Sequence, residues 1–350
     1  MDDEVARAAR SIEANPLGRL MHGQRELFHS NLIAWFFDAL PEAADAVFRP
    51  FMVDGDVASR SIERERSHLD LVVRLPGRSP LVVENKVFAL PDAVQLRRYE
   101  DAVARWSTPP AFVLLAASTP DFALGRWTHI DYRELAAAIE AALPSGSSYE
   151  VETMRRYAAL ARDVQSLVDA VAVRSEGESV WLAPRVLDVI GSRQTRAALH
   201  KARATHVARH LRALDLGDRW RIRADMTRGT PLVEAFARVV DDGLDVRLGW
   251  QLQGSQLRRA VIFDEPIARG RDEGAKDVRT SLSRAHPSWF ALPPEFDAVG
   301  SSEFNHYAPD FVYRYAKAPA LTVADLAGFA SWVSQRVAPL ESRRSASGPS

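Results

Sequence analysis

The pattern of apolar and polar residues predicts alternating helices and strands in the first half of the chain. Apolar residues at positions 28, 32, 33, 36, 37 and 40 recur with the period of an α-helix, so residues 24–40 are expected to form a helix with a buried face. Three segments rich in Val, Ile and Leu follow, at residues 61–66, 68–75 and 81–87. The turn-forming run Pro76-Gly-Arg-Ser-Pro80 separates the last two, which is typical of a β-hairpin.

The pattern continues with further helices and strands. They are expected at residues 92–105 (helix), 112–116 and 127–132 (strands), and 133–142 and 149–173 (helices). This order predicts a mixed α/β domain over residues 1–173.

The second half of the chain has a different pattern. The polar stretch 174–182 contains Gly and Ser and is expected to be a linker. A helix over 183–214 and a final helix capped by Thr322 and Asp325 enclose a series of strands, at residues 220–224, 232–240, 244–252, 257–263 and 310–315. These elements predict an α+β domain over residues 183–340, followed by a disordered tail at 341–350.

The composition excludes several classes of protein. Hydrophobic residues make up 47% of the 350 residues, enough for a buried core, and no cysteine is available for a disulfide, a thiolate metal site or a nucleophile. No apolar run is long enough to span a membrane, and the chain starts Met-Asp-Asp-Glu, unlike a signal peptide, so a cytoplasmic protein is expected. The 45 basic and 46 acidic residues nearly balance, so any charge that binds nucleic acid must be local.

Three charged residues interrupt the apolar strands. If the hairpin is symmetric about Gly77, Asp70 lies directly opposite Glu84, with Cβ atoms ~4.5–5.5 Å apart. Two carboxylates this close repel unless a cation lies between them, and a hard divalent cation such as Mg²⁺ or Mn²⁺ suits oxygen ligands. Lys86 shares the face of Glu84 and could hold an attacking hydroxide or neutralise charge on a phosphate. The alternative is an ordinary salt bridge across an exposed sheet, although the apolar residues around Glu84 favour a buried strand.

These features together resemble the PD-(D/E)XK nuclease superfamily, which has the restriction-endonuclease-like fold. The resemblance runs from residue 26 to residue 132 and comprises a helix, Asp70, Glu84-Asn85-Lys86, a helix carrying Gln95-Leu96-Arg97-Arg98-Tyr99, and a further strand. One departure is that Leu69, not a proline, precedes the first acidic residue. The resemblance implies a nuclease dependent on Mg²⁺ or Mn²⁺, with Asp70 and Glu84 as metal ligands and Lys86 as the catalytic cation.

The same resemblance implies three accessory residues. Glu26, on the first helix, would help to hold a metal, and Gln95 and Tyr99 would lie beside the active site. Glu26 shares a helical face with His29 and Ser30, which could be polar helpers of that site or ordinary residues of a surface helix.

A local surplus of Lys and Arg lies in residues 192–228. A phosphate-binding surface would explain this surplus and would include Arg196, Lys201, Arg203 and Arg209; a solvated helix face explains it equally well. Aromatic residues of the C-terminal half could stack on bases, but are more typical of a core.

The sequence therefore predicts a metal-dependent nuclease, active in defence or DNA processing. DNA is favoured over RNA as the substrate, and the C-terminal domain would bind substrate or a protein partner. The alternative is a non-catalytic regulator that keeps the nuclease fold to bind nucleic acid or protein.

Overall fold

The computed structural model describes residues 2–21, 25–66, 69–89, 91–120, 122–188, 190–217, 219–265, 268–296, 298–299, 304–307 and 309–346. The chain forms two compact units. Unit 1 comprises Met1–Ala172 and Pro184–Ala202, and unit 2 comprises Val173–Ala183 and Arg203–Ser350. The expected linker at 174–182 is thus part of unit 2, because its backbone pairs there: Ser179 forms a β-bridge with Thr322, and Val180 N donates to Leu321 O at 2.9 Å.

Unit 1 is built on a five-stranded mixed sheet with the order β1-β2-β3-β4-β5. Its strands are β1 (Ser61–Arg66), β2 (Leu69–Arg74), β3 (Leu81–Lys86), β4 (Ala111–Ala116) and β5 (Trp127–Ile130). The first three strands are antiparallel, whereas β3, β4 and β5 run parallel. The predicted mixed α/β fold is confirmed.

The turn between β2 and β3 sets the register of the central hairpin. Arg78 N donates to Leu75 O at 3.1 Å, and Gly77 lies between them with φ 73°, which requires glycine in a type II turn preceded by Pro76. The ladder pairs Val72 with Val82, as the symmetric hairpin predicts.

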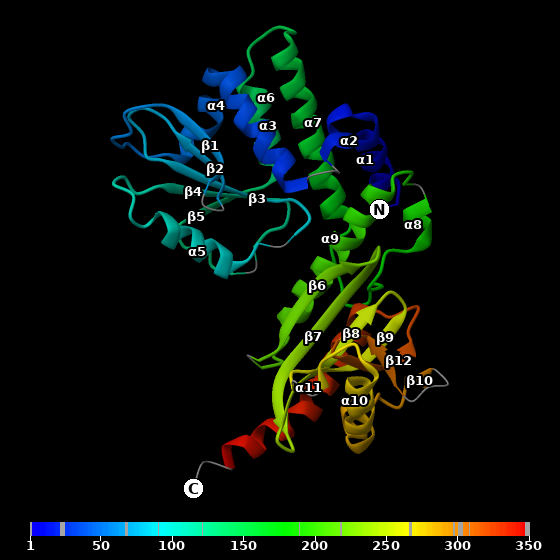
Figure 1. Ribbon diagram of the computed structural model, residues 1–350. Helices are drawn as coiled ribbons and strands as arrows, with labels where there is room; N and C mark the ends of the chain where they lie inside the picture. Colours follow the sequence, from blue (N-terminus) through cyan, green and yellow to red (C-terminus); the bar gives the residue numbers. More distant parts are fainter. Residues whose placement is uncertain are drawn as a thin grey trace. The chain divides into compact units, whose positions relative to one another are not determined.

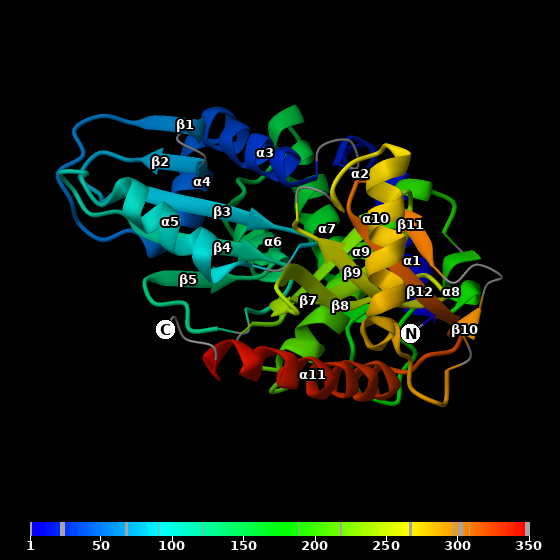
Figure 2. The same ribbon diagram turned by 60° about the horizontal axis from the view of Figure 1, so that its bottom comes forward.

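Helices cover both faces of this sheet (Figure 1 and Figure 2). On one face lies α5 (Ala93–Val103), whose N-cap Asp92 accepts a hydrogen bond from Val94 N. The other face is covered by α3 (Arg25–Ala39), α4 (Pro41–Phe48), α6 (Tyr132–Ala142) and α7 (Tyr149–Ala170). Short elements complete the unit: α1 (Asp2–Ala14), α2 (Pro16–Met21), η1 (Arg49–Phe51) and α8 (Pro184–Asp188). The sequence pattern did not predict α1, α2 or α4, whose buried faces consist partly of alanine in α1 and α4 and of glycine in α2.

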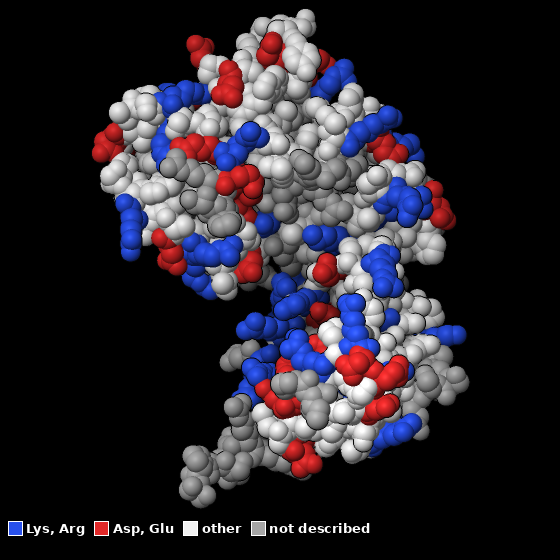
Figure 3. Space-filling model, in the orientation of Figure 1, with Lys and Arg blue, Asp and Glu red and all other residues white. Residues whose placement is uncertain are grey.

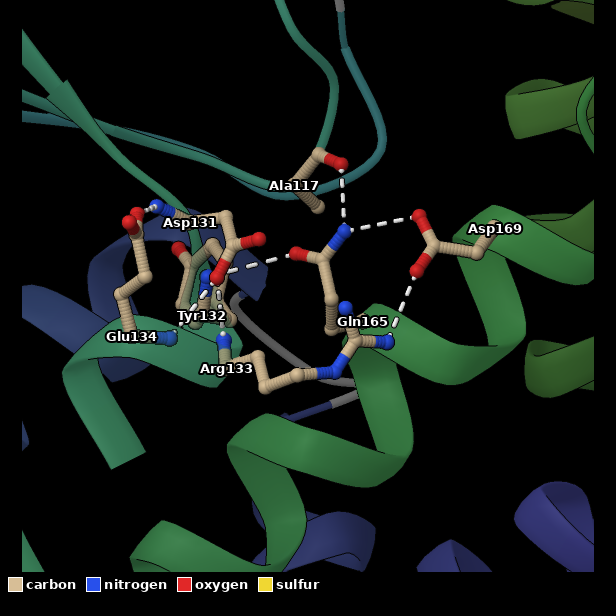
Figure 4. Close-up of polar contacts among 7 residues, drawn as sticks. All are labelled: Ala117, Asp131, Tyr132, Arg133, Glu134, Gln165 and Asp169. Atoms are coloured by element: carbon tan, nitrogen blue, oxygen red, sulfur yellow. Dashed lines mark hydrogen bonds and ion pairs between the residues drawn. The ribbon is translucent and has the colours of Figure 1, made fainter. Parts of the chain in front are cut away.

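A buried amide joins three elements of unit 1. Gln165 of α7 donates from Nε2 to Ala117 O, just after β4, and to Asp169 Oδ1, both at 2.9 Å (Figure 4). Its Oε1 accepts from Tyr132 N at 3.2 Å, in the first turn of α6. That turn is also held by a capping box between Asp131 and Glu134. The side chain therefore satisfies a strand end and a helix start at once.

Unit 2 contains a seven-stranded sheet with the order β10-β12-β9-β8-β7-β6, in which β11 also pairs with β12. Its strands are β6 (Arg221–Thr227), β7 (Thr230–Asp241), β8 (Leu244–Gln253), β9 (Gln256–Phe263), β10 (Ala298–Val299), β11 (Asn305–Tyr307) and β12 (Phe311–Lys317). Every pairing is antiparallel. Two-residue turns at 228–229 and 242–243 have positive φ at both positions, the geometry that suits tight hairpins.

Helices α9 (Arg193–Arg212), α10 (Glu273–Ala285) and α11 (Val323–Ala346), with η3 (Pro287–Phe290), complete the structure. Residues 183–214 do not form the single helix that was predicted, because Ser192 starts a new helix by accepting from Thr195 N. The capping box of Thr322 and Asp325 is confirmed. Helix α11 extends to Ala346, into the segment expected to be disordered, and residues 347–350 lie outside the described range. No helix among the described residues is long and apolar enough to cross a membrane.

Replacing Gln165 by leucine should lower the free energy of unfolding of unit 1 by about 1–3 kcal/mol, because two buried backbone groups lose their partner. Hydrogen-exchange mass spectrometry on peptides from α7 measures this locally. Arg133→Ala is the matched control: it removes only the half-exposed Arg133–Asp169 ion pair (2.9 Å), for which we expect a loss of about 0–1 kcal/mol. Equal losses in the two variants would contradict the role of Gln165.

His29 should make unit 1 less stable in acid. Its ring is buried and contacts the Tyr157 hydroxyl through Nδ1 at 3.0 Å, and burial lowers its pKa from 6.5 to about 3. The unfolded chain therefore binds the proton more strongly than the folded chain. The contribution of neutral His29 to the free energy of unfolding is complete above about pH 6.5, and below that pH it falls by up to ~1.4 kcal/mol per pH unit. His29→Gln should flatten this slope in urea denaturation between pH 4.5 and 6.5. Tyr157→Phe keeps the ring buried and should retain the slope.

Candidate active site

Asp70 and Glu84 lie next to each other on the face of the sheet that α5 covers. Continuing the ladder by one step from Leu71–Val83 places Asp70 opposite Glu84. Val72 and Val82, the adjacent pair on this face, belong to the same buried cluster as Leu96 and Tyr99 of α5. The alternation of side chains along β2 and β3 thus places both carboxylates beneath α5.

Lys86 and Gln95 both contact the same oxygen of Glu84. Lys86 Nζ lies 2.7 Å from Glu84 Oε1, and Gln95 Nε2 donates to this atom at 3.0 Å. Gln95 Nε2 also lies 2.5 Å from the hydroxyl of Tyr99, one turn further along α5. The structure therefore brings together five of the residues that the sequence singled out.

The electrostatics of the site are set by burial and by like charge. Only 1% of the Glu84 side chain is exposed. Burial, and after it the negative charge of Asp70, raise the pKa of Glu84 to about 8, although Lys86 opposes the shift. In the described part of the chain, no donor reaches Glu84 Oε2, although this oxygen is buried. A carboxylate oxygen in this position lacks compensation for its lost hydration.

This arrangement suits a divalent cation. Asp70 and Glu84 supply hard oxygen donors on one face, and a cation between them would compensate both their repulsion and the orphaned Glu84 Oε2. Among the described residues, no group of three or more His, Asp and Glu side chains converges on one point. The side chain of Glu26, the predicted third ligand, lies outside the described residues. The residues present therefore fit a metal held by two carboxylates, with further positions left for water or substrate.

Asn85 is a structural residue of this site that the sequence did not single out. Its backbone N–H donates to Asp70 Oδ2 at 2.9 Å, which orients that carboxylate. On the opposite face of the sheet, its side-chain amide donates to Ser30 Oγ of α3 at 2.5 Å. The only signal in the sequence is its position between Glu84 and Lys86, which points it to the opposite face.

His29 and Ser30 are not helpers at the predicted metal site. His29 is buried against Tyr132 and Tyr157, with ring centroids 4.8 and 5.7 Å away. Ser30 is also buried, and its contact with Asn85 joins α3 to β3. Both residues support the sheet from the face opposite the carboxylates.

Arg203 is removed from the predicted phosphate-binding set. Its side chain is buried, and its guanidinium donates to Val180 O at 3.1 Å, to Ser179 O and to Glu178 Oε2 at 3.0 Å. It therefore anchors the segment before α8 instead of facing a ligand. The three other predicted residues, Arg196, Lys201 and Arg209, are half-buried, and only Arg209 belongs to unit 2.

Comparison with known proteins finds one family model that matches a large part of unit 1. The family model of the PD-(D/E)XK nuclease superfamily matches residues 16–158. No curated protein and no solved structure matches the chain. The matched range includes the five-stranded sheet with Asp70, Glu84 and Lys86, as well as α5 with Gln95 and Tyr99. The predicted resemblance is confirmed: residues 16–158 match the PD-(D/E)XK nuclease superfamily.

Proposed function

We propose that unit 1 hydrolyses phosphodiester bonds of nucleic acid in a reaction that requires Mg²⁺ or Mn²⁺, with DNA as the preferred substrate. The observation that carries this proposal is the group of Asp70, Glu84 and Lys86 on one face of the β2–β3 hairpin. An ammonium 2.7 Å from a buried carboxylate that adjoins a second carboxylate is suited to hydrolysis of a phosphate ester. A salt bridge that serves only stability would leave the second carboxylate and the orphaned Glu84 oxygen unexplained.

Each residue has a distinct role in this proposal. Asp70 and Glu84 hold the cation, which supplies a water of lowered pKa and neutralises charge on the phosphate. Lys86 orients the attacking water and stabilises negative charge that develops on the phosphoryl oxygens. Gln95 fixes the Glu84 carboxylate through the hydrogen bond to Oε1, and Tyr99 in turn positions the Gln95 amide. Asn85 orients Asp70 through its backbone N–H.

Asp70→Asn, Glu84→Gln and Lys86→Met should each lower nuclease activity by about a thousandfold or more, because the three groups act as a unit and removing one disables the others. The assay uses labelled single-stranded, double-stranded and branched DNA and RNA, with Mg²⁺ or Mn²⁺. Asp101→Asn is the matched control, since it neutralises an exposed carboxylate on α5. If Lys86→Met cleaved at the wild-type rate, the assigned role of Lys86 would be wrong.

Mn²⁺ should raise the melting temperature of the wild-type protein and of Asp101→Asn, but not of Asp70→Asn. A ligand that binds only the folded state at tenfold its Kd stabilises by about 1.4 kcal/mol, which corresponds to ~3–6 °C for a domain of this size. Differential scanning calorimetry with and without Mn²⁺ measures the shift within each variant. An equal shift in Asp70→Asn would place the metal elsewhere, whether or not the protein cleaves nucleic acid.

A further inference from the structure

One face of the unit 2 sheet carries arginine and aromatic side chains instead of the core. The opposite face packs on α11, where Trp250 meets Phe329 at 6.2 Å between ring centroids. Because side chains alternate along each strand, the residues that pair in register across β6, β7, β8, β9 and β12 form rows on a common face. One such row contains Arg221, Phe236, Gly249, Ala260 and Tyr313.

A groove of about 600 Å³ lies over this face, lined by Arg219, Arg221, Arg223, Phe236, Arg238 and Arg247. On β8, the residue that pairs with Phe236 is Gly249. A Cβ atom on Gly249 would come within 2.6 Å of the Phe236 ring and 2.1 Å of Ala235 O. Only glycine therefore lets the Phe236 ring lie against the neighbouring strand.

The charge of the groove is positive. Arg238 and Arg247 lie directly opposite each other, a like-charge pair that Asp245 and Asp264 compensate through ion pairs. Arg221 and Arg223 of β6 are exposed and form no ion pair with any residue that the structure describes. Glu234 also lines the groove, where it accepts a hydrogen bond from Gln251. Figure 3 shows Lys and Arg side chains gathered over β6 and β7.

Half-buried aromatic rings extend this face on the side of β12. The Phe236 and Phe311 ring centroids lie 6.2 Å apart, and those of Phe311 and Tyr313 lie 5.5 Å apart. Tyr315 continues the series, and the guanidinium of Arg258 lies 4.5 Å from the Tyr313 centroid. Sheet faces that are open to solvent rarely carry so many rings. The rings, together with Arg221 and Arg223 on the neighbouring strand β6, match the two parts of a nucleotide, its base and its phosphate.

We propose that this sheet face binds single-stranded nucleic acid, with phosphates on Arg221 and Arg223 and a base stacked on Phe236. A single strand is the occupant that fits, because its bases are free to stack, whereas a duplex hides them and presents only phosphates. The proposal deepens the proposed nuclease function by naming the class of substrate, and it rests on that function for the choice of nucleic acid. The binding itself does not require catalysis.

The test uses the full chain with Asp70→Asn, so that no cleavage interferes with binding. Fluorescence anisotropy with a labelled 20-nucleotide oligo(dT), an oligo(U) of equal length and a 20-base-pair duplex measures the affinity at several salt concentrations. We expect both single strands to bind more tightly than the duplex. A difference between oligo(dT) and oligo(U) distinguishes DNA from RNA as the source of the strand.

Two sets of variants separate phosphate contacts from base contacts. Arg221→Ala with Arg223→Ala should flatten the slope of log K against log salt by about 1.4, since each lost phosphate contact on a single strand removes ~0.7. Phe236→Leu keeps an apolar side chain but loses the ring, so affinity should fall by about 5- to 100-fold with the slope unchanged. Arg271→Ala with Arg284→Ala removes two exposed arginines outside the groove and should leave affinity and slope unchanged.

The proposal is overturned if the Asp70→Asn chain fails to bind either single strand, or if the β6 double variant binds with the parental affinity and salt slope. Tighter binding of the duplex, with no effect of Phe236→Leu, would overturn the assignment to single strands. These outcomes are independent of the cleavage assay: a chain that cleaves normally but shows unaltered binding in the variants would refute only the surface. A chain that binds as expected but never cleaves would refute only the nuclease activity.

Discussion

The close approach of two carboxylates beneath α5 is the constraint on which the structure of unit 1 depends. Burial and like charge both raise the pKa of Glu84, so the surrounding residues have to supply positive charge and hydrogen bonds. Lys86 comes from the same strand, Gln95 comes from the next helix, and the backbone of Asn85 holds Asp70. The helix α5 therefore has two inseparable tasks: its apolar side excludes water from the sheet, and its polar positions compensate the charges that this exclusion makes costly.

Much of this site was predictable because it depends on local geometry. Pro76 and Gly77 are typical of the two central residues of a tight turn, and they fix the register of β2 against β3. The alternation of side chains then decides which residues of the two strands share a face. A slip of one residue would have placed Asp70 on the face that packs on α3. The capping box at Thr322 was predictable for the same reason, since all of its partners lie within four residues.

Features that depend on distant contacts were not predictable. Arg203 lies in a segment rich in basic residues, and the sequence of that segment does not show that its side chain is buried. The side chain is buried because its partners are main-chain and side-chain atoms about 25 residues earlier in the chain. The same contacts make the supposed linker part of unit 2. The helices α1 and α2 escaped prediction because alanine and glycine provide much of their buried surface, so the apolar period is weak.

In the sheet of unit 1 the charged side chain of Glu84 is buried, whereas in the sheet of unit 2 those of Arg221 and Arg223 are exposed. This difference follows from the kind of chemistry that each sheet could support. A hydrolytic site needs few charges in a dry environment, where each one acts strongly, and β3 accordingly buries Glu84 beside a single lysine. A surface that follows a flexible polyanion needs several charges that remain hydrated and exchange easily with counterions, and β6 holds its arginines exposed. The residues of such a surface are contributed one or two per strand, so no contiguous motif marks it. Only the antiparallel ladder, with glycine at position 249 to admit the ring of Phe236, assembles them into one face.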